Sequence, residues 1–272
     1  MTGATRIDLA RQGRWRPLPF VSNTWLRRGL NLALLVYLAL VYYSVEVNWG
    51  RVAEGMERGL NFIGSFLSPD FVSRTGEIFQ GLAESLTMTF TSTVIGVALA
   101  IPVGLGAARN IAPLPVYLLC RAVIAVSRTF QEIIIAIFFV AMVGFGPLAG
   151  VITLAFATIG FMAKLLAEDI EGARAEPMEA IRATGAGWWQ WVHYAVQPQV
   201  MPRLIGLSLY RLDINFRESA VIGIVGAGGI GATLNTSINR YDYDTSAAIL
   251  LLIIVIVLAS EYVSGIVRRF IQ

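Results

Sequence analysis

The sequence predicts an all-α integral membrane protein with six transmembrane helices. Of its 272 residues, 56% are hydrophobic and 14% are charged, whereas soluble domains contain about 25% charged residues. The mean hydropathy is +0.66, and the 26 glycines suit the close helix packing found in lipid. A span needs about 20 predominantly apolar residues. The segments that reach or approach this length are 29–46, 80–106, 116–143, 147–167, 202–224 and 246–267.

The first span follows a basic arm, residues 1–28. Six of the 21 lysine and arginine residues of the chain lie in this arm, and such an excess holds a segment in the cytoplasm. The arm also resembles the basic region of a signal peptide, but the apolar run after it ends without a small-x-small cleavage site. We therefore expect an uncleaved first span.

The loops between the other spans indicate their orientation. Basic residues lie in the 107–115 loop, in the 168–198 loop and at the C-terminus, so with six spans both termini are expected to face the cytoplasm. The outward 47–79 loop contains an amphipathic segment, expected to lie on the outer membrane surface. Its apolar residues on one side of a helix are Val52, Met56, Leu60, Ile63 and Leu67. Residues 29–272 are expected to form a single domain.

The 168–198 loop is the longest polar segment on the expected cytoplasmic side. Pro177 suits the first turn of a helix, and Glu176 favours a helix start electrostatically. Gly185 would end that helix, and we expect a second one to begin at the following tryptophans and to stop at Pro198. From the residues alone, this pattern equally fits a helical hairpin at the membrane interface with its tryptophans at the lipid headgroups.

The fifth span carries charges at bilayer depth, where they are expensive and usually functional. Its polar residues include Arg211, Asp213, Asn215, Arg217, Glu218 and Ser219. Asp213 and Arg217 are four residues apart and can pair on one helix face. Arg211 has no acidic partner on its own side nearer than Glu218. Either these residues form structural pairs, or Arg211, together with Arg217, attracts a tetrahedral oxyanion through the planar fork of its guanidinium.

A second polar patch lies in the third span. Arg128 and Glu132 are four residues apart, with Gln131 beside them. On a continuous helix the two charges would form a self-neutralising pair. The alternative is that they line the same path as the polar residues of the fifth span.

The segment Gly226-Ala227-Gly228-Gly229-Ile230-Gly231 fits the dinucleotide pattern G-x-G-x-x-G. That pattern requires a strand–helix–strand unit with an acidic residue about 20 residues further on, and here a hydrophobic span follows instead. We expect a flexible outward loop. The sequence has no G-x-x-x-x-G-K-[ST] motif, and its single cysteine and single histidine allow no Cys-x-x-Cys or His-x-x-x-His metal site.

The 168–198 loop resembles a motif of bacterial ABC-importer permeases, the EAA loop. Glu179-Ala180, Gly185 and Pro198 stand at its spacing, and Ile181, Ala195 and Gln197 depart from it. Further segments are similar to the permease of phosphonate ABC importers, over about residues 80–268. These segments are 144–150, 164–168, 182–186, 197–202, 210–219 and 223–231.

This resemblance implies the type I ABC importer permease fold and three groups of functional residues. In that family the EAA loop is a coupling helix that binds a separate ATPase subunit, which implicates Glu176, Glu179, Ala180, Arg182, Gly185 and Ala186. The substrate path would include Arg211, Asn215, Arg217, Glu218, Ser219, Arg128 and Glu132. An outer gate facing the binding protein would include Gly226, Gly228, Gly229 and Gly231.

The resemblance also implies partners and a location. The chain would be a transporter subunit of the bacterial inner membrane rather than an enzyme, and would need no cofactor of its own. ATP and magnesium would bind to two copies of an ATP-binding subunit. A second copy of this chain, membrane lipid and a periplasmic or lipid-anchored binding protein complete the expected partners, and no nucleic acid is among them. The substrate would be a phosphonate, phosphate or phosphite.

Two other functions stay open at this point. An EAA-type permease could carry another solute, such as methionine or a polar amino acid, because an arginine also binds a carboxylate. A proton-conducting subunit of an energy-transducing complex could use the charged residues of the third and fifth spans as a proton route. That second function would leave the 168–198 loop without a purpose.

Overall fold

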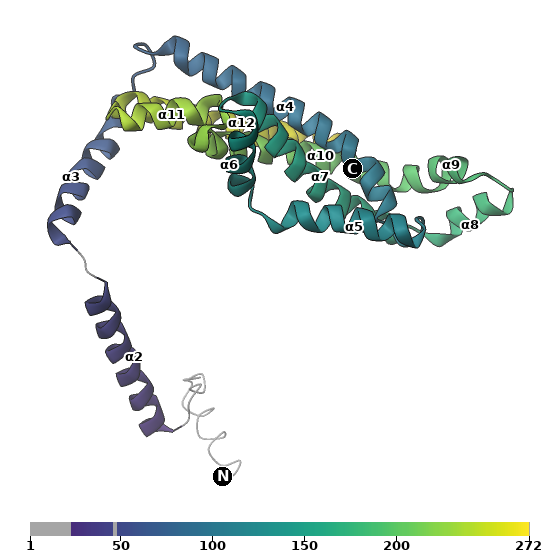
Figure 1. The fold of residues 1–272 in the computed structure, drawn as a ribbon, viewed down its shortest axis with the longest axis horizontal. Coiled ribbons are helices and arrows are strands. Elements are labelled where there is room, and N and C mark those ends of the chain that lie inside the picture. The colour runs from purple at the N-terminus through teal and green to yellow at the C-terminus, as the bar shows by residue number, and fades with distance from the viewer. Residues whose placement is uncertain (1–22, 46–47, 272) are drawn as a thin grey trace, which may run out of the picture. The chain divides into compact units, whose positions relative to one another are not determined.

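The structure, a computed structural model, describes residues 23–45 and 48–271. These residues form helices joined by turns, and no β-strand occurs among them. The chain divides into two compact units, residues 1–59 and 60–272. Figure 1 shows the path of the chain through its helices.

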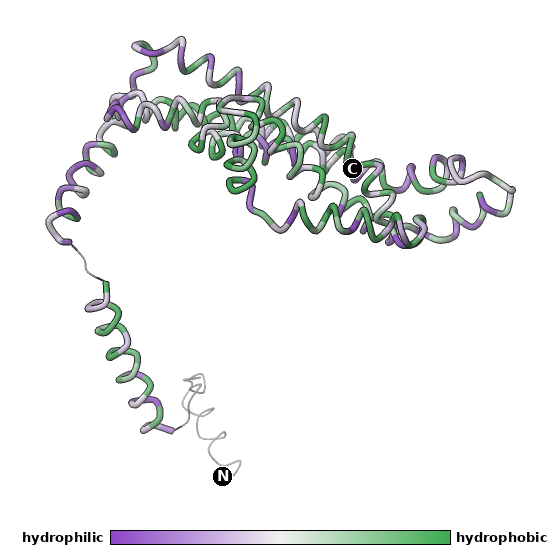
Figure 2. Tube along the Cα trace, in the orientation of Figure 1, coloured by the Kyte–Doolittle hydropathy of each residue, from purple (hydrophilic) through white to green (hydrophobic). Residues whose placement is uncertain are grey.

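The first unit contains α2 (Thr24–Ser44) and most of α3 (Trp49–Ser65). Asn23 caps α2, since its side chain accepts a hydrogen bond from the N–H of Trp25 at 3.0 Å. The amphipathic segment of the 47–79 loop is confirmed as a helix, α3. Figure 2 shows hydrophobic residues dominating α2, whereas α3 carries many hydrophilic ones.

The core of the second unit is the contact between α4 (Thr75–Gly106) and α7 (Pro147–Glu171), the most extensive between any two helices described. Small residues bring the two backbones close. A side chain at Gly96 would collide with Thr158, and one at Gly104 would collide with Leu166. This close contact fixes the position of α7, which carries part of the site described below.

The third predicted span is not one continuous helix. It consists of α5 (Leu114–Thr129) and α6 (Glu132–Val143), which meet at an angle of 96°. Phe130 and Gln131 between them have extended backbone angles, with ψ of 141° and 146°. The span predicted over 116–143 is therefore a bent pair of helices, and no glycine or proline in the sequence marks the break.

The segment after α7 forms a helical hairpin, as predicted, but its second half does not end at Pro198. The hairpin consists of α8 (Ala175–Ala183) and α9 (Trp188–Trp191), followed by the π-helix η1 (Val192–Val196) and α10 (Gln197–Ile222). Pro198 lies in the first turn of α10, which continues directly from the π-helical turn η1.

The glycine-rich segment is also more regular than expected. The π-helix η2 (Gly223–Ala227) leads into α11 (Gly229–Asn239) with a bend of 58°, and α12 (Tyr243–Ile271) ends the chain. By length and composition, four helices of the described chain can cross a membrane, namely α2, α4, α7 and α12. The number rises to six if each bent pair is one span, which agrees with the six spans predicted.

Candidate functional site

Arg211 of α10 is a buried cation held by α7. Its side chain is 4% exposed. Its Nε donates a hydrogen bond to Thr158 Oγ1 at 3.1 Å, and its Cζ lies 5.4 Å from the ring centroid of Phe161, within the range of a cation–π contact. The guanidinium is thus fixed on two sides by residues of α7.

A buried network supports this arginine. Thr158 Oγ1 donates to the carbonyl of Leu154 at 2.6 Å and accepts hydrogen bonds from Arg211 Nε and from Asn215 Nδ2, the latter at 3.0 Å. Asn215 Nδ2 also donates to Thr93 Oγ1 at 2.8 Å. The network joins α4, α7 and α10, so Asn215 positions the helices around Arg211.

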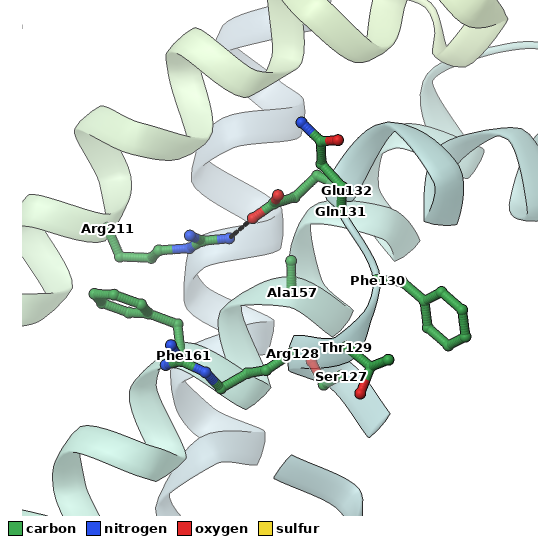
Figure 3. Close-up of a pocket in the computed structure, with 9 residues that line it drawn as sticks. All are labelled: Ser127, Arg128, Thr129, Phe130, Gln131, Glu132, Ala157, Phe161 and Arg211. Carbon is green, nitrogen blue, oxygen red and sulfur yellow. Dashed lines mark ion pairs between the residues drawn. The ribbon is translucent and has the colours of Figure 1, made fainter. Parts of the chain in front are cut away.

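The guanidinium faces the carboxylate of Glu132, at the first turn of α6 (Figure 3). Arg211 Nη2 and Glu132 Oε1 are 3.7 Å apart, farther than the 2.7–2.9 Å of a charge-assisted hydrogen bond. Nη2 is fully buried, and it makes no hydrogen bond with any residue that the structure describes. A buried donor without a partner is rare and calls for an explanation.

A cavity of about 350 Å³ lies beside this pair. It is lined by Ser127, Arg128, Thr129, Phe130, Gln131, Glu132, Ala157, Phe161 and Arg211. Arg128 is exposed and makes no ion pair within the described part of the chain. Figure 3 shows Phe130 pointing away from Arg211. The cavity has the size of a small-molecule site and carries two arginines against one carboxylate.

The break between α5 and α6 changes the predicted pairing in the third span. The interpretation of Arg128 and Glu132 as a self-neutralising pair was wrong, because the two residues belong to different helices and Glu132 pairs with Arg211 instead. Thr158 and Phe161, which hold Arg211, were missed. They lie in an apolar span, and nothing in their local sequence distinguishes them from packing residues.

In the fifth span, the pairing of Asp213 with Arg217 is confirmed. Arg217 Nη2 lies 2.9 Å from Asp213 Oδ2, and Ser260 of α12 donates a hydrogen bond to the same carboxylate. Arg217, Glu218 and Ser219 do not line the cavity. The hydroxyl of Ser219 is buried and donates to the carbonyl of Phe216 at 2.7 Å. Arg217 is thus paired on its own helix, whereas Arg211 contacts α7 and faces Glu132 of α6. Glu218 lies close enough to Arg211 and Glu132 to interact with both electrostatically.

The glycine-rich segment forms an ordered turn rather than a flexible loop. Gly226, Gly228 and Gly229 have φ angles of 97°, 79° and 73°, which other residues rarely adopt. The side chains of α4 close this turn. Glu84 Oε2 accepts the N–H of Gly229 at 3.1 Å, and Ser85 Oγ accepts the N–H of Ile230 at 2.9 Å. Its role as an outer gate stays a prediction.

Gly231 in this segment packs closely against the backbone of Ala220, and a substitution tests this packing. A Cβ at Gly231 would overlap the carbonyl oxygen of Ala220. This oxygen belongs to the backbone and cannot readily move away. Gly231→Ala is expected to destabilise the protein by about 1–3 kcal/mol, measured as a lower melting temperature in detergent. Gly206→Ala on α10 is the control, because nothing lies within 4 Å of its added Cβ. Equal melting temperatures for the two variants would contradict this packing role.

The α8–α9 hairpin has a packed face and an exposed face. Met178 and Ile181 pack against a hydrophobic cluster of α7, η1 and α10. Trp191 Nε1 donates to the carbonyl of Met178 at 3.0 Å, and the Arg182 guanidinium lies 4.1 Å from a Trp191 ring centroid. On the opposite side, the exposed residues of α8 include Glu176, Glu179, Ala180 and Ala183. Their spacing places them along one helix face.

The base of the hairpin is fixed, whereas its tip is open. Glu171 Oε1 accepts a hydrogen bond from Arg121 Nη2 at 2.9 Å, and Gln199 Oε1 accepts the N–H of Arg174 at 2.9 Å. At the tip, Gly185 has a φ of 79° and nothing within 4 Å of the place where a Cβ would lie. Ala186 beside it is half-buried. The hairpin therefore presents small and acidic residues on a surface whose base is held by hydrogen bonds.

Comparison with known proteins places this geometry among transport proteins. Residues 100–272 match the family described as "Binding-protein-dependent transport system inner membrane component". The chain is 46% identical over 243 residues to the phosphate-import permease protein PhnE of Mycolicibacterium smegmatis, covering 89% of this chain and 46% of that protein. It thus spans about half the length of that relative. It is 37% identical to the phosphite transport system permease protein PtxC of Stutzerimonas stutzeri, covering 94% of this chain and 90% of that protein.

Solved structures show the same fold. A structure entitled "Inward facing conformations of the MetNI methionine ABC transporter" superposes with a TM-score of 0.64 at 24% sequence identity, covering 74% of this chain and 100% of that one. An amino acid ABC transporter structure superposes with a TM-score of 0.62 at 21% identity. The helices described above thus have the arrangement of type I ABC importer permeases, as the sequence predicted.

Proposed function

This chain belongs to the family of binding-protein-dependent transport system inner membrane components, and on that premise we propose that it is the permease subunit of an ATP-driven importer of phosphonate or of a related oxyanion, phosphate or phosphite. The relatives named for phosphate and phosphite support this substrate class. Because the chain spans about half of the first of them, its own substrate must be tested directly.

The observation that carries this proposal is the buried Arg211 with its unpaired Nη2 beside a cavity. A charge at bilayer depth typically marks a substrate path. The planar guanidinium offers paired donors that match the oxygens of a tetrahedral oxyanion. Arg128 adds a second positive charge to the lining of the same cavity. In the lining itself the two arginines outnumber the one carboxylate, which favours an anion over a neutral or cationic solute. Glu218 interacts electrostatically with Arg211 from outside the lining.

The energy for transport would come from other subunits. The sequence contains no G-x-x-x-x-G-K-[ST] motif, so ATP and magnesium would bind to two copies of a separate ATPase. The exposed face of α8, with Glu176, Glu179 and Ala180, would contact it. A second copy of this chain would complete the membrane path, and a periplasmic or lipid-anchored binding protein would deliver the substrate on the outside. Both termini would face the cytoplasm.

Transport would then follow from movement of the hairpins. ATP binding closes the ATPase pair and draws the two α8–α9 hairpins together, which opens the spans outward to receive the substrate. Hydrolysis returns them to the inward-open state. The rigid base of the hairpin, fixed by Glu171 and Gln199, suits this role because a displacement of α8 passes directly to α7 and α10.

The test is the ATPase rate of the reconstituted complex with its binding protein, first unloaded and then loaded with methylphosphonate, phosphite, phosphate or methionine. We expect stimulation by at least one of the oxyanions and none by methionine. Stimulation by methionine alone would keep the ATP-coupled mechanism and overturn the substrate class. A complex that assembles without stimulation by any of these solutes would contradict the proposal as a whole.

A further inference from the structure

We infer that Glu132 is an exchangeable counterion of Arg211: the imported oxyanion displaces the Glu132 carboxylate and takes its place between Arg211 and the N-terminus of α6. This inference rests on the proposed function and goes further, because it assigns a role to a residue of like charge to the substrate. Glu132 stands where one oxygen of the anion would bind.

The two partners of this ion pair are held unequally. Arg211 is 4% exposed and is fixed by Thr158 and Phe161 of α7. Glu132 is 28% exposed, and its carboxylate lies 3.7 Å from Arg211, beyond hydrogen-bond distance. The carboxylate can therefore swing into the open cavity, whereas the guanidinium stays in place. Exchange of the carboxylate for another anion requires this asymmetry.

The N-terminus of α6 supplies further donors at the same point. Gln131 precedes the helix, and no side chain caps it. The carbonyl of Gln131 accepts the N–H groups of Ile134 and Ile135, which leaves the first N–H groups of the helix without a helical partner. Such a helix end favours an anion. Arg211 and Glu132, the first residue of α6, both line the cavity, so the guanidinium and this helix end lie at the same cavity.

Exchange explains why the pair is both charged and poorly bonded. A buried arginine without a counterion would be strongly destabilising, so an empty path needs a carboxylate near Arg211. A carboxylate with ideal hydrogen bonds would compete too well with the substrate. A pair at 3.7 Å neutralises the arginine and leaves its Nη2 donor free for the incoming anion. Return of Glu132 then helps release, which a transport site requires because binding must be reversible.

The experiment compares two variants with opposite expected effects. Binding of radiolabelled methylphosphonate, phosphite and phosphate is measured by equilibrium dialysis on the permease–ATPase complex in lipid nanodiscs, without binding protein or nucleotide. Glu132→Gln keeps the shape and removes the competing charge, so we expect about tenfold tighter binding. Gln131→Glu adds a carboxylate at the same helix end, and we expect about tenfold weaker binding. Gln131 is exposed, so this variant tests the site even where Glu132→Gln fails to fold.

A control and a transport assay complete the test. Glu168→Gln removes a carboxylate from the exposed pair with Lys164 and should leave the affinity unchanged. In proteoliposomes containing the complete importer, Glu132→Gln should lower both the KM and the maximal uptake rate, because the anion then leaves slowly. Unchanged affinity in both site variants, with normal wild-type uptake, would overturn the role of Glu132 while the proposed function stands. Failure of the wild type to import any of the three anions would instead reject the proposed function.

Discussion

Replacing Arg211 by methionine is expected to reduce oxyanion uptake by about a hundredfold, since removing one partner of a buried, desolvated charge interaction costs about 2–5 kcal/mol. The variant loses the unpaired Nη2 donor and leaves only the exposed Arg128 to balance Glu132 in the cavity lining, so the lining no longer carries a surplus of positive charge. The measurement is the initial rate of uptake into proteoliposomes that contain the wild-type ATPase and binding protein. Retention of a third or more of the wild-type rate would show that the anion does not pass Arg211.

Loss of folding is the competing explanation, and a double variant separates the two. Removing both members of a buried ion pair is often neutral for stability, whereas removing one is not. Arg211→Met combined with Glu132→Gln should therefore recover the melting temperature of the wild type without recovering uptake. If the double variant regains transport, the single variant failed for structural reasons alone.

Arg217→Met serves as the matched comparison on the same helix. Arg217 is 50% exposed and bonded to Asp213, and it does not line the cavity. Uptake should fall by less than about threefold, because the pair lies outside the cavity and Asp213 keeps its hydrogen bond from Ser260. From the sequence, both arginines were candidates for binding the oxyanion. Of the two, Arg211 lines the cavity and Arg217 does not, and the two variants test which of them acts on uptake.

Local interactions of this site were predictable and long-range ones were not. The pairing of Asp213 with Arg217 follows from a four-residue spacing on one helix, and the structure confirms it. The pairing of Arg211 with Glu132 depends on the 96° bend between α5 and α6. Phe130 and Gln131 at that bend have no intrinsic tendency to end a helix. The helices α5 and α6 pack against α7, and α6 also contacts α10. Such long-range contacts are not visible in the local sequence, so the sequence alone could not locate the break.

The same distinction holds for the hairpin and the glycine-rich turn. The positions of Pro177 and Gly185 indicate where α8 begins and ends, because proline is favoured in the first turn of a helix and glycine just after its last turn. The order of the glycine-rich turn arises from Glu84 and Ser85 of α4, which are distant in sequence. Glycines indicate unusual angles, but they do not reveal whether another helix holds them in place.

The second large effect on transport is expected from a substitution in the α8–α9 hairpin. Gly185→Val is expected to lower substrate-stimulated ATPase activity and uptake by tenfold or more, while membrane insertion and expression persist. A φ of 79° is strained for a β-branched residue by about 1–2 kcal/mol or more, so the tip would change its path and move α8 relative to α9. No neighbour lies within 4 Å of the added Cβ, so the effect comes from the backbone and not from crowding.

Two companion variants identify the cause of this loss. Gly187→Ala in the same turn should be harmless, because Gly187 has a φ of −66° and its added Cβ would meet only Gln190, at 3.8 Å. Glu179→Arg reverses a charge on the exposed face of α8 and breaks no ion pair within the described chain. It should weaken co-purification of the ATPase without lowering the melting temperature of the permease. Normal uptake in both Gly185→Val and Glu179→Arg would mean that the ATPase binds another surface, and the interfacial hairpin with its tryptophans at the headgroups would then be the better interpretation of α8 and α9.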